Sequence, residues 1–397
     1  NSSAASDVYK RQPTVVGVAV LLAIIGGAVT KDWYTWIYRG LSFLVVSCPC
    51  ALVVSVPLSF FAGIGSASRQ GILIKGSNYL EMLDKANVFV FDKTGTLTKG
   101  NFVVTAIEPE SNKDEVLRLA AIAEHDSNHP IARSIVSCYR GEIESGYTLT
   151  NVAGFGILAT KGDDVIYCGN EKLMKSYDIK YVKQNGVGTV VYVAKNGKFV
   201  GSLLISDEIK PESKQAISEL NAMGAKTVML TGDNEVIAAS VAQEIGLSDY
   251  KASLLPQNKV EHVEQLLSQK KKGDVLCFVG DGINDAPVLM RSDIGIAMGG
   301  VGSDAAIEAS DVVLMQDDLK GISTAKRIAK KTMRVVYENI VGSLAVKILI
   351  MALSATGVLG AYSMWIAVVG DVGVAIAAIL NAMRVNKGTK TTVKLEK

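Results

Sequence analysis

An aspartate that stands directly after an apolar run, with a glycine-containing turn behind it, has the arrangement of a nucleophile for phosphoryl chemistry. The run covers residues 88–91 and has the composition of a buried parallel strand, and it leads into Asp92-Lys93-Thr94-Gly95-Thr96-Leu97-Thr98. The carboxyl ends of parallel strands form the crevice where α/β sheets hold ligands, and the N–H groups of such a turn can face an anion. Asp92 can therefore attack phosphorus and carry an aspartyl phosphate.

Two further apolar runs end in polar motifs of the same kind. Residues 227–230 precede Thr231-Gly232-Asp233, and residues 275–279 precede Gly280-Asp281-Gly282-Ile283-Asn284-Asp285. Because Mg²⁺ prefers oxygen ligands, we expect Asp281, supported by Asp285, to hold it beside Asp92. We expect Thr231 to donate to a phosphoryl oxygen and Lys259 to supply fixed positive charge, since phosphoryl transfer depends on positioning and charge neutralisation. Taken singly, each motif could be an ordinary Gly-Asp turn, and Lys259 could lie on a solvated helix face.

Four apolar stretches in the 397-residue chain predict membrane helices. They cover residues 13–30, 33–62, 340–360 and 363–383, each near the ~20 residues that span a bilayer. Residues 69–338 have ordinary charge content and are predicted to form one large water-soluble region. The net charge of +2 includes no basic stripe, so nucleic acid is not an expected partner.

Basic residues flank three of the predicted helix ends and give the orientation. They are Arg69, Lys75 and Lys85; Lys326, Arg327, Lys330, Lys331 and Arg334; and Arg384, Lys387 and Lys390. By the positive-inside rule these flanks, and the soluble region between them, are predicted to be cytoplasmic.

Within the apolar stretches, a few residues can bind a metal ion. Cys48-Pro49-Cys50 lies in the second stretch, where Pro49 would kink the helix and let both thiols face one cavity. Lys347 and Asp371 lie in the last two stretches, where a charge usually faces a partner or a cavity. Two thiolates, one carboxylate and one ammonium sum to minus two, which favours a divalent ion over monovalent copper. Alternatively, Cys48 and Cys50 are two small apolar residues around a proline kink, and Lys347 and Asp371 form a structural pair without a metal ion.

These motifs together resemble the P-type ATPases. Residues 92–98 are similar to the phosphorylation motif of that family, and the motifs at 231–233 and 280–287 are similar to its haloacid-dehalogenase-like core. Cys-Pro-Cys, Lys347 and the Asp-x-Gly at Asp371 resemble the zinc-, cadmium- and lead-exporting subgroup, whereas copper pumps have Tyr-Asn and Met-Ser-Ser in those two helices. The resemblance implies catalytic roles for Asp92, Lys93, Thr94, Thr231, Gly232, Asp233 and Lys259. It implies that Asp92, Thr94, Asp281 and Asp285 hold Mg²⁺, and that Cys48, Cys50, Lys347 and Asp371 hold the transported ion.

The sequence contains no Walker-type phosphate loop, so the nucleotide must be held by another element. Residues 99–206 are the candidate, and they end in a predicted hairpin with an Asn196-Gly197 turn. A Ser-x-His-Pro element followed by Gly-x-Gly resembles the nucleotide-binding domain of heavy-metal pumps. The resemblance implies that ATP contacts Glu124, His129, Gly154, Gly156, Gly169 and Asn170. The alternative for His129 is a capped helix start before Pro130.

The predicted fold class is α/β plus membrane helices: a haloacid-dehalogenase-like Rossmann phosphorylation domain with an inserted α+β nucleotide-binding domain, flanked by two membrane hairpins. The predicted boundaries are 1–12 for a non-native lead, 13–68 and 331–385 for the hairpins, 69–98 with 206–330 for phosphorylation, 99–205 for nucleotide binding and 386–397 for a cytoplasmic tail.

The resemblance implies ATP-driven export of Zn²⁺, Cd²⁺ or Pb²⁺ across a bacterial plasma membrane. Its partners would be the lipid bilayer, ATP, the metal ion, and the family's actuator domain and earlier membrane helices, which this sequence lacks. The alternatives are a copper pump and a membrane-anchored phosphatase or metal sensor with the same core.

Overall fold

The computed structural model describes residues 2–48, 50–184, 186–281, 285–299, 304–356, 358 and 360–386. Pro49, Gly282-Ile283-Asn284, Lys387 and Lys390, which contributed to the predictions above, lie outside the described residues. The chain forms two compact units, one of Asn1–Lys85 with Thr324–Lys397 and one of Ala86–Ser323. Each is described by itself.

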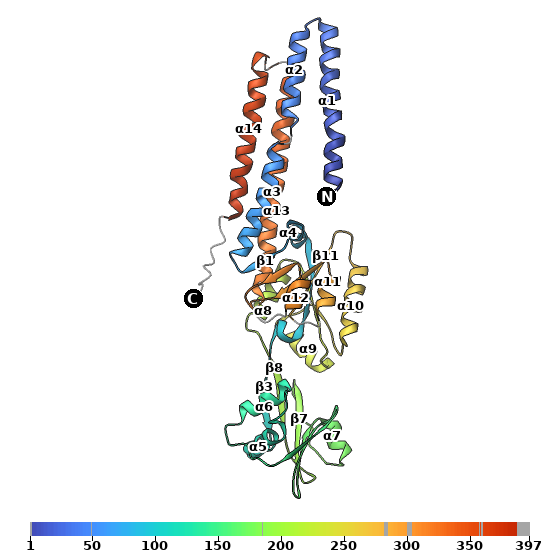
Figure 1. The fold of residues 1–397 in the computed structure, drawn as a ribbon, viewed down its shortest axis with the longest axis vertical. Helices are drawn as coiled ribbons and strands as arrows, with labels where there is room; N and C mark the ends of the chain where they lie inside the picture. Colours follow the sequence, from blue (N-terminus) through green and yellow to red (C-terminus); the bar gives the residue numbers. More distant parts are fainter. Residues whose placement is uncertain are drawn as a thin grey trace. The chain divides into compact units, whose positions relative to one another are not determined.

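A parallel sheet forms the first part of the Ala86–Ser323 unit (Figure 1). Its strands are β2 (Ala86–Asp92), β9 (Lys226–Leu230), β10 (Asp249–Lys251), β11 (Val275–Gly280), β12 (Ile294–Met298) and β13 (Val312–Leu314). They lie in the order β13-β12-β11-β2-β9-β10, and every neighbouring pair is parallel. The three strands predicted to end in polar motifs are therefore adjacent, with β2 between β11 and β9.

Helices cover this sheet, and both of its faces are buried. The helices are α8 (Ser213–Ala222), α9 (Glu235–Ile245), α10 (Pro256–Gln269), α11 (Ala286–Arg291) and α12 (Asp304–Ala309). Val90, Leu276 and Phe278 pack with residues of α10, α11 and α12. Phe89 and Cys277, which alternate with them and point the other way, are also fully buried. Burial on both faces explains why these strands are continuous apolar runs.

An antiparallel sheet forms the rest of this unit. It contains β3 (Thr98–Glu108), β4 (Thr148–Val152), β5 (Gly156–Lys161), β6 (Asp164–Gly169), β7 (Thr189–Lys195) and β8 (Lys198–Ile209), in the order β3-β8-β7-β6-β5-β4. The short η2 (Glu110–Asn112) precedes α5 (Lys113–Glu124), which packs with α6 (Pro130–Cys138) on one face, whereas α7 (Glu171–Ser176) packs on the other. Asn196 and Gly197 join β7 to β8 with φ of 50° and 76°, so the predicted hairpin turn is confirmed.

The other unit consists mainly of long apolar helices. They are α1 (Ser2–Thr30), α2 (Trp33–Val46), α3 (Cys50–Ser68), α13 (Lys320–Thr356) and α14 (Ser363–Ala382), with the shorter β1 (Ile72–Ile74), α4 (Ser77–Lys85), η4 (Gly360–Tyr362) and η5 (Met383–Asn386). Among the described residues, four segments are long and apolar enough to cross a membrane: Pro13–Thr30, Trp33–Ser68, Lys320–Ser354 and Met364–Asn386.

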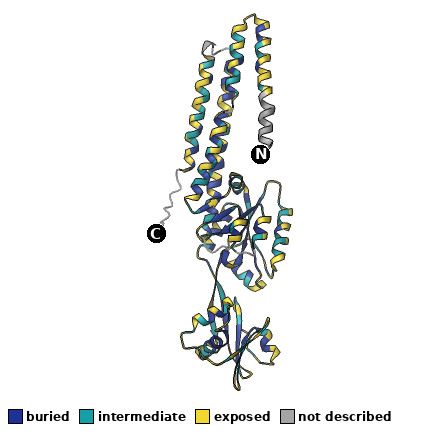
Figure 2. Cartoon of the chain, in the orientation of Figure 1, coloured by how far each residue is buried: buried dark blue, intermediate teal, exposed yellow. Residues whose placement is uncertain are grey.

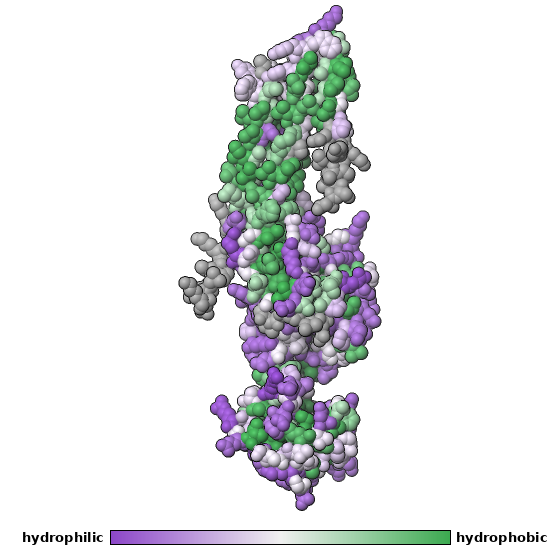
Figure 3. Space-filling model, in the orientation of Figure 1, coloured by the Kyte–Doolittle hydropathy of each residue, from purple (hydrophilic) through white to green (hydrophobic). Residues whose placement is uncertain are grey.

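Apolar side chains of these helices lie on the outside. Val29, Phe61 and Val369 are 78%, 71% and 67% exposed. Figure 2 shows the many exposed residues on these helices, and Figure 3 shows hydrophobic side chains gathered over them on the drawn face. Such a surface suits lipid, in which helices satisfy their own backbone hydrogen bonds. The prediction of membrane-spanning helices is confirmed by length, composition and exposure.

Two of the predicted spans differ in detail from the structure. The stretch 33–62 is two helices, since α2 ends at Val46 and α3 begins at Cys50. Residues 340–356 of the stretch 340–360 are the later part of α13, which already begins at Lys320. Hydropathy detects only the apolar part of a helix, whereas lysine and arginine have good helix propensity and extend α13 through its basic segment.

Candidate functional site

Asp92 ends the central strand of the parallel sheet and begins a tight turn. It is 7% exposed and pairs in register with Leu230 of the neighbouring β9. Gly95 in the turn has a φ of 75°, and a Cβ added there would lie 1.8 Å from Oδ2 of Asp281. Only glycine fits such a position, because an L-residue would be strained and would collide with the carboxylate. The sequence therefore uses this glycine to bring the turn against the end of β11.

Three carboxylates meet at this edge of the sheet. Among the residues that the structure describes, Asp92, Asp281 and Asp285 each offer an oxygen, and these oxygens lie within 4.8 Å of one another. Burial, and then the neighbouring charge of Asp285, raise the pKa of Asp92 to about 7. The same two causes raise the pKa of Asp281 to about 6. Crowded, desolvated carboxylates of this kind fit a hard divalent cation such as Mg²⁺.

Lys259 supplies the positive charge of the cluster. From α10, its Nζ lies 2.5 Å from Oδ1 of Asp92 and 3.2 Å from Oδ1 of Asp285. Burial alone would lower the pKa of Lys259, but the two carboxylates outweigh burial and raise it. The ammonium therefore stays charged beside the nucleophile. The structure thus places Lys259 beside Asp92, and its role in phosphoryl transfer stays a prediction.

The Thr231-Gly232-Asp233 motif follows β9 and has a different set of contacts. Thr231 is 2% exposed, and its Oγ1 accepts a hydrogen bond of 3.1 Å from the Asp233 N–H. The Asp233 carboxylate contacts the ammonium of Lys93, which also lies 3.7 Å from Asp207. Lys93 is thus engaged with Asp233 and Asp207, whereas Lys259 is the lysine in contact with Asp92. Of the other predicted residues, Thr94 and Gly232 are exposed.

The sequence interpretation missed Lys210 and its partners. Lys210 follows β8 and is 3% exposed. Its Nζ donates to the Gly95 carbonyl over 2.7 Å and contacts Oδ1 of Asp317 over 2.6 Å. Its charge also opposes the rise in the pKa of Asp281. The local sequence, a lysine before Pro211 where the chain leaves β8, gives no sign of these contacts.

The residues predicted to bind nucleotide lie on and beside β5 and β6. Gly156 pairs with Gly169 across the two strands, and a Cβ at Gly156 would lie 2.3 Å from the Cys168 carbonyl. Asn170 caps α7 and donates from Nδ2 to the Gly154 carbonyl over 2.9 Å. The structure therefore brings these glycines and Asn170 together.

Glu124 and His129 extend this group from the end of α5. The Glu124 carboxyl is buried against the Cys168 thiol, with Oε1 and Sγ 3.7 Å apart, and burial raises the pKa of Glu124. Ser127 hydrogen bonds to Glu124, and its Oγ accepts the His129 N–H over 3.3 Å. The exposed His129 caps α6, because its Nδ1 accepts the Ile131 N–H. The helix-start alternative is observed, and the nucleotide contact stays a prediction.

A polar group lies inside the helical unit at the break between α2 and α3. The Lys347 Nζ contacts the Cys48 carbonyl, lies 3.3 Å from the Val46 carbonyl and 2.5 Å from Oδ1 of Asp371. Lys347 is 6% exposed. Cys48 and Cys50 form a disulfide in the structure, so their sulfur atoms are adjacent and the reduced pair is the form with thiolates for a metal. The structure thus brings the four predicted metal-site residues together: Lys347 contacts Asp371 and the backbone carbonyl of Cys48, and Cys48 is bonded to Cys50.

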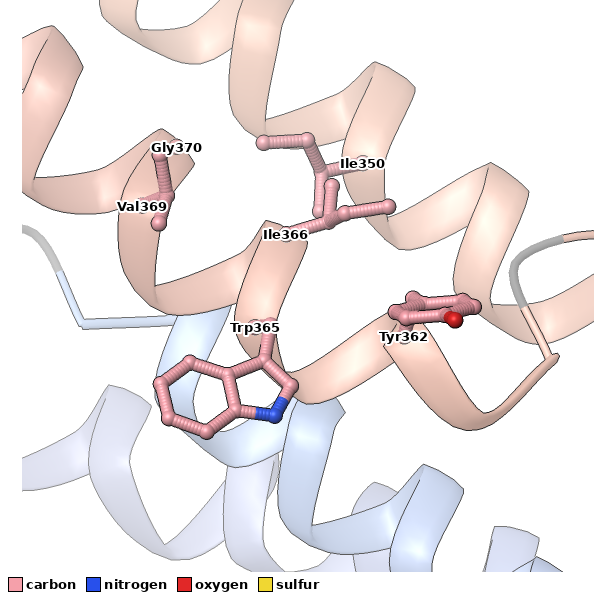
Figure 4. Close-up of a pocket in the computed structure, with 6 residues that line it drawn as sticks. All are labelled: Ile350, Tyr362, Trp365, Ile366, Val369 and Gly370. Atoms are coloured by element: carbon pink, nitrogen blue, oxygen red, sulfur yellow. The ribbon is translucent and has the colours of Figure 1, made fainter.

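An apolar pocket of about 410 Å³ lies beside this group on α13, η4 and α14. Figure 4 shows the six residues that line it, which include Ile350, Trp365 and Gly370. None of its six lining residues has a carboxylate, an imidazole or a thiol, so the pocket offers no ligand typical of a heavy-metal ion.

The comparisons with known proteins agree with this geometry. Residues 86–293 match the haloacid dehalogenase-like hydrolase family. The chain is 49% identical over 386 residues to the cadmium, zinc and cobalt-transporting ATPase of Bacillus subtilis, with 94% of this chain and 54% of that protein covered. It is 48% identical over 385 residues to the zinc-transporting ATPase of Synechocystis sp., with 94% and 52% covered.

Solved structures give the same result. A zinc-transporting PIB-type ATPase in the E2.Pi state superposes with a TM-score of 0.82 at 35% identity, covering 95% of this chain and 62% of that one. The chain spans about half the length of the curated relatives that it matches. It belongs to the haloacid dehalogenase-like hydrolase family, and its predicted resemblance to the heavy-metal-transporting P-type ATPases is confirmed along nearly its whole length.

Proposed function

We propose that the full-length protein containing this chain exports a divalent heavy metal ion, driven by ATP through a phosphate on Asp92. The observation that carries the proposal is the Lys347–Asp371 pair, buried against the carbonyls of a broken Cys-Pro-Cys helix in a chain that also holds a phosphoryl-transfer cluster. Relatives that transport cadmium, zinc and cobalt support a divalent ion and do not favour copper. They do not support a phosphatase or sensor either.

In the proposed phosphorylation step, an Asp92 carboxylate oxygen attacks the γ-phosphorus of ATP. The bond from that oxygen to phosphorus forms, the bond to the bridging oxygen breaks, and ADP leaves. Lys259 lies against the attacking carboxylate and offsets the charge of the three acids. Thr231 would donate to a phosphoryl oxygen. Mg²⁺, held by Asp92, Asp281 and Asp285 with Thr94, would supply further positive charge to the phosphoryl oxygens.

The nucleotide is proposed to bind the antiparallel part of the chain at Glu124, His129, Gly154, Gly156, Gly169 and Asn170. The strands β3 and β8 connect this part to the phosphorylation turn, since Thr98 pairs with Ile209. Hydrolysis of the aspartyl phosphate would depend on an actuator domain supplied by another segment of the protein.

In the membrane, the cargo would replace the Lys347 ammonium at Asp371 and bind the reduced thiolates of Cys48 and Cys50. The two thiolates, the Asp371 carboxylate and the displaced ammonium together still carry a charge of minus two, which matches Zn²⁺ or Cd²⁺. The family resemblance also predicted Pb²⁺ as a transported ion. The name of the Bacillus subtilis relative adds Co²⁺ to the candidate ions.

Metal-stimulated ATP turnover of the purified full-length protein tests this proposal. Zn²⁺ and Cd²⁺ should stimulate the wild type, whereas Asp371→Ala and Cys48→Ser should remove the stimulation. Stimulation by Cu⁺ that ignores Asp371 would refute the divalent assignment.

A further inference from the structure

A cavity with mainly apolar walls lies along α13 and α14 and reaches Val346, the residue before Lys347. It has a volume of about 270 Å³, and the polar side chains of its lining are those of Glu338, Asn339, Ser343 and Asn381. Asn339 is tied to α14, because its Nδ2 donates to the Ala378 carbonyl and its Oδ1 accepts from Asn381. Ser343 is 2% exposed, and its Oγ has no hydrogen-bond partner among the described residues. A buried hydroxyl without a partner costs free energy and asks for an explanation.

The neighbouring ammonium is fully engaged in this structure. Lys347 has three N–H groups, and its Nζ has three oxygen partners: the carbonyls of Val46 and Cys48 and the Asp371 carboxylate. A divalent ion at Asp371 would repel the ammonium and take its carboxylate partner. In an environment of low dielectric, the displaced ammonium then needs another oxygen.

Helix geometry directs Lys347 toward Ser343. The two residues are four positions apart on α13, so they lie on one face and about 6 Å apart along the axis. Helical side chains lean toward the amino terminus, which is the direction from Lys347 to Ser343. Ser354, another buried serine of α13 whose Oγ lacks a partner among the described residues, lies on the carboxyl-terminal side of Lys347 and does not line the cavity.

We propose that the Ser343 hydroxyl and its cavity receive the Lys347 ammonium when the metal ion occupies Asp371. This inference rests on the proposed function and adds a second position for the lysine. Ser343 is then a positioning residue: it stabilises the metal-bound state by accepting a hydrogen bond from the displaced ammonium. The metal-free state, in which Lys347 bonds to Asp371, does not use it.

Equilibrium Zn²⁺ titration of the purified, reduced full-length protein in detergent tests the proposal. Ser343→Ala should weaken Zn²⁺ binding about tenfold, since a hydrogen bond to a charged group is lost from the bound state. Ser343→Thr keeps the acceptor and should bind within about threefold of wild type. Ser354→Ala, the matched control, removes another buried hydroxyl of α13 that has no partner among the described residues, and it should leave the affinity unchanged.

A double-mutant cycle separates this role from simple packing. In a Lys347→Met background there is no ammonium to receive, so adding Ser343→Ala should leave Zn²⁺ affinity unchanged. Wild-type affinity in Ser343→Ala, or an equal loss in both backgrounds, would overturn the proposal while leaving the metal site intact. If Asp371→Ala binds Zn²⁺ as tightly as wild type, the proposed function fails as well.

Discussion

Replacing the nucleophile by its neutral isostere should stabilise the protein, and by an amount that depends on pH. Asp92 has a pKa of about 7 in the folded protein, against 3.8 for an ordinary aspartate. That difference corresponds to about 4 kcal/mol of free energy of unfolding, on the scale of 1.36 kcal/mol per pKa unit. The folded state pays this cost when Asp92 is ionised, because the carboxylate is buried beside Asp285.

The sign follows from the direction of the pKa change. Below pH 3.8 the carboxyl is protonated in both the folded and the unfolded state, so its raised pKa does not lower the free energy of unfolding there. The wild type then loses stability as pH rises from 3.8 to 7, whereas Asp92→Asn does not titrate. The free energy of unfolding of Asp92→Asn should therefore exceed that of the wild type only slightly at pH 4 and by up to about 4 kcal/mol at pH 8. The larger difference corresponds to a rise in Tm on the order of 10 °C.

Thermal unfolding of wild type and Asp92→Asn between pH 4 and pH 8 in the absence of Mg²⁺ measures this difference. Asp126, an aspartate whose side chain is 76% exposed, provides the control, since Asp126→Asn should change the free energy of unfolding by under about 1 kcal/mol at every pH in this range. Saturating Mg²⁺ should shrink the advantage, because the cation offsets the same repulsion. Equal or lower stability of Asp92→Asn at pH 8 would refute the electrostatic reasoning.

Three other changes test separate parts of the site. Gly95→Ala places a Cβ 1.8 Å from the Asp281 carboxylate at a φ of 75°. Phosphorylation from labelled ATP should therefore slow by about tenfold or more. An unchanged rate would show that the turn moves freely. Glu124→Gln should weaken ATP binding about tenfold by calorimetry in the Asp92→Asn background, and an unchanged affinity would remove Glu124 from the nucleotide site. Lys210→Met should cost about 2 kcal/mol or more, since it breaks a buried contact, whereas Lys99→Met in an exposed pair should cost under about 1 kcal/mol; equal costs would contradict the role of Lys210.

The strands and the catalytic cluster could be predicted because their signals are local. Each strand is a continuous apolar run that ends in an acid or hydroxyl, and parallel pairing alone brings Asp92, Thr231 and Asp281 to one edge. The pairing of Lys259 with Asp92 is a contact over a long sequence separation. The chemistry of phosphoryl transfer called for a positive charge, but a lysine on α10 by itself also suits a solvated face, and the family resemblance favoured the site.

Other features depend on tertiary contacts that leave no local pattern. Lys210 was missed because a lysine after a strand gives no sign of contact with Gly95 and Asp317. The engagement of Lys93 with Asp207 and Asp233 likewise depends on two distant strand ends meeting. In the helical unit, hydropathy located the spans but not the start of α13, because propensity rather than apolarity sets that boundary.

The most direct test of the account is the identity of the phosphorylated residue. The full-length protein is incubated with γ-labelled ATP, Mg²⁺ and Zn²⁺, quenched in acid, and mapped by mass spectrometry. We predict a hydroxylamine-sensitive phosphate on Asp92, absent in Asp92→Asn and retained in the Asp126→Asn control. A label on another residue, or undiminished labelling of Asp92→Asn, would contradict the assignment of Asp92 as the nucleophile.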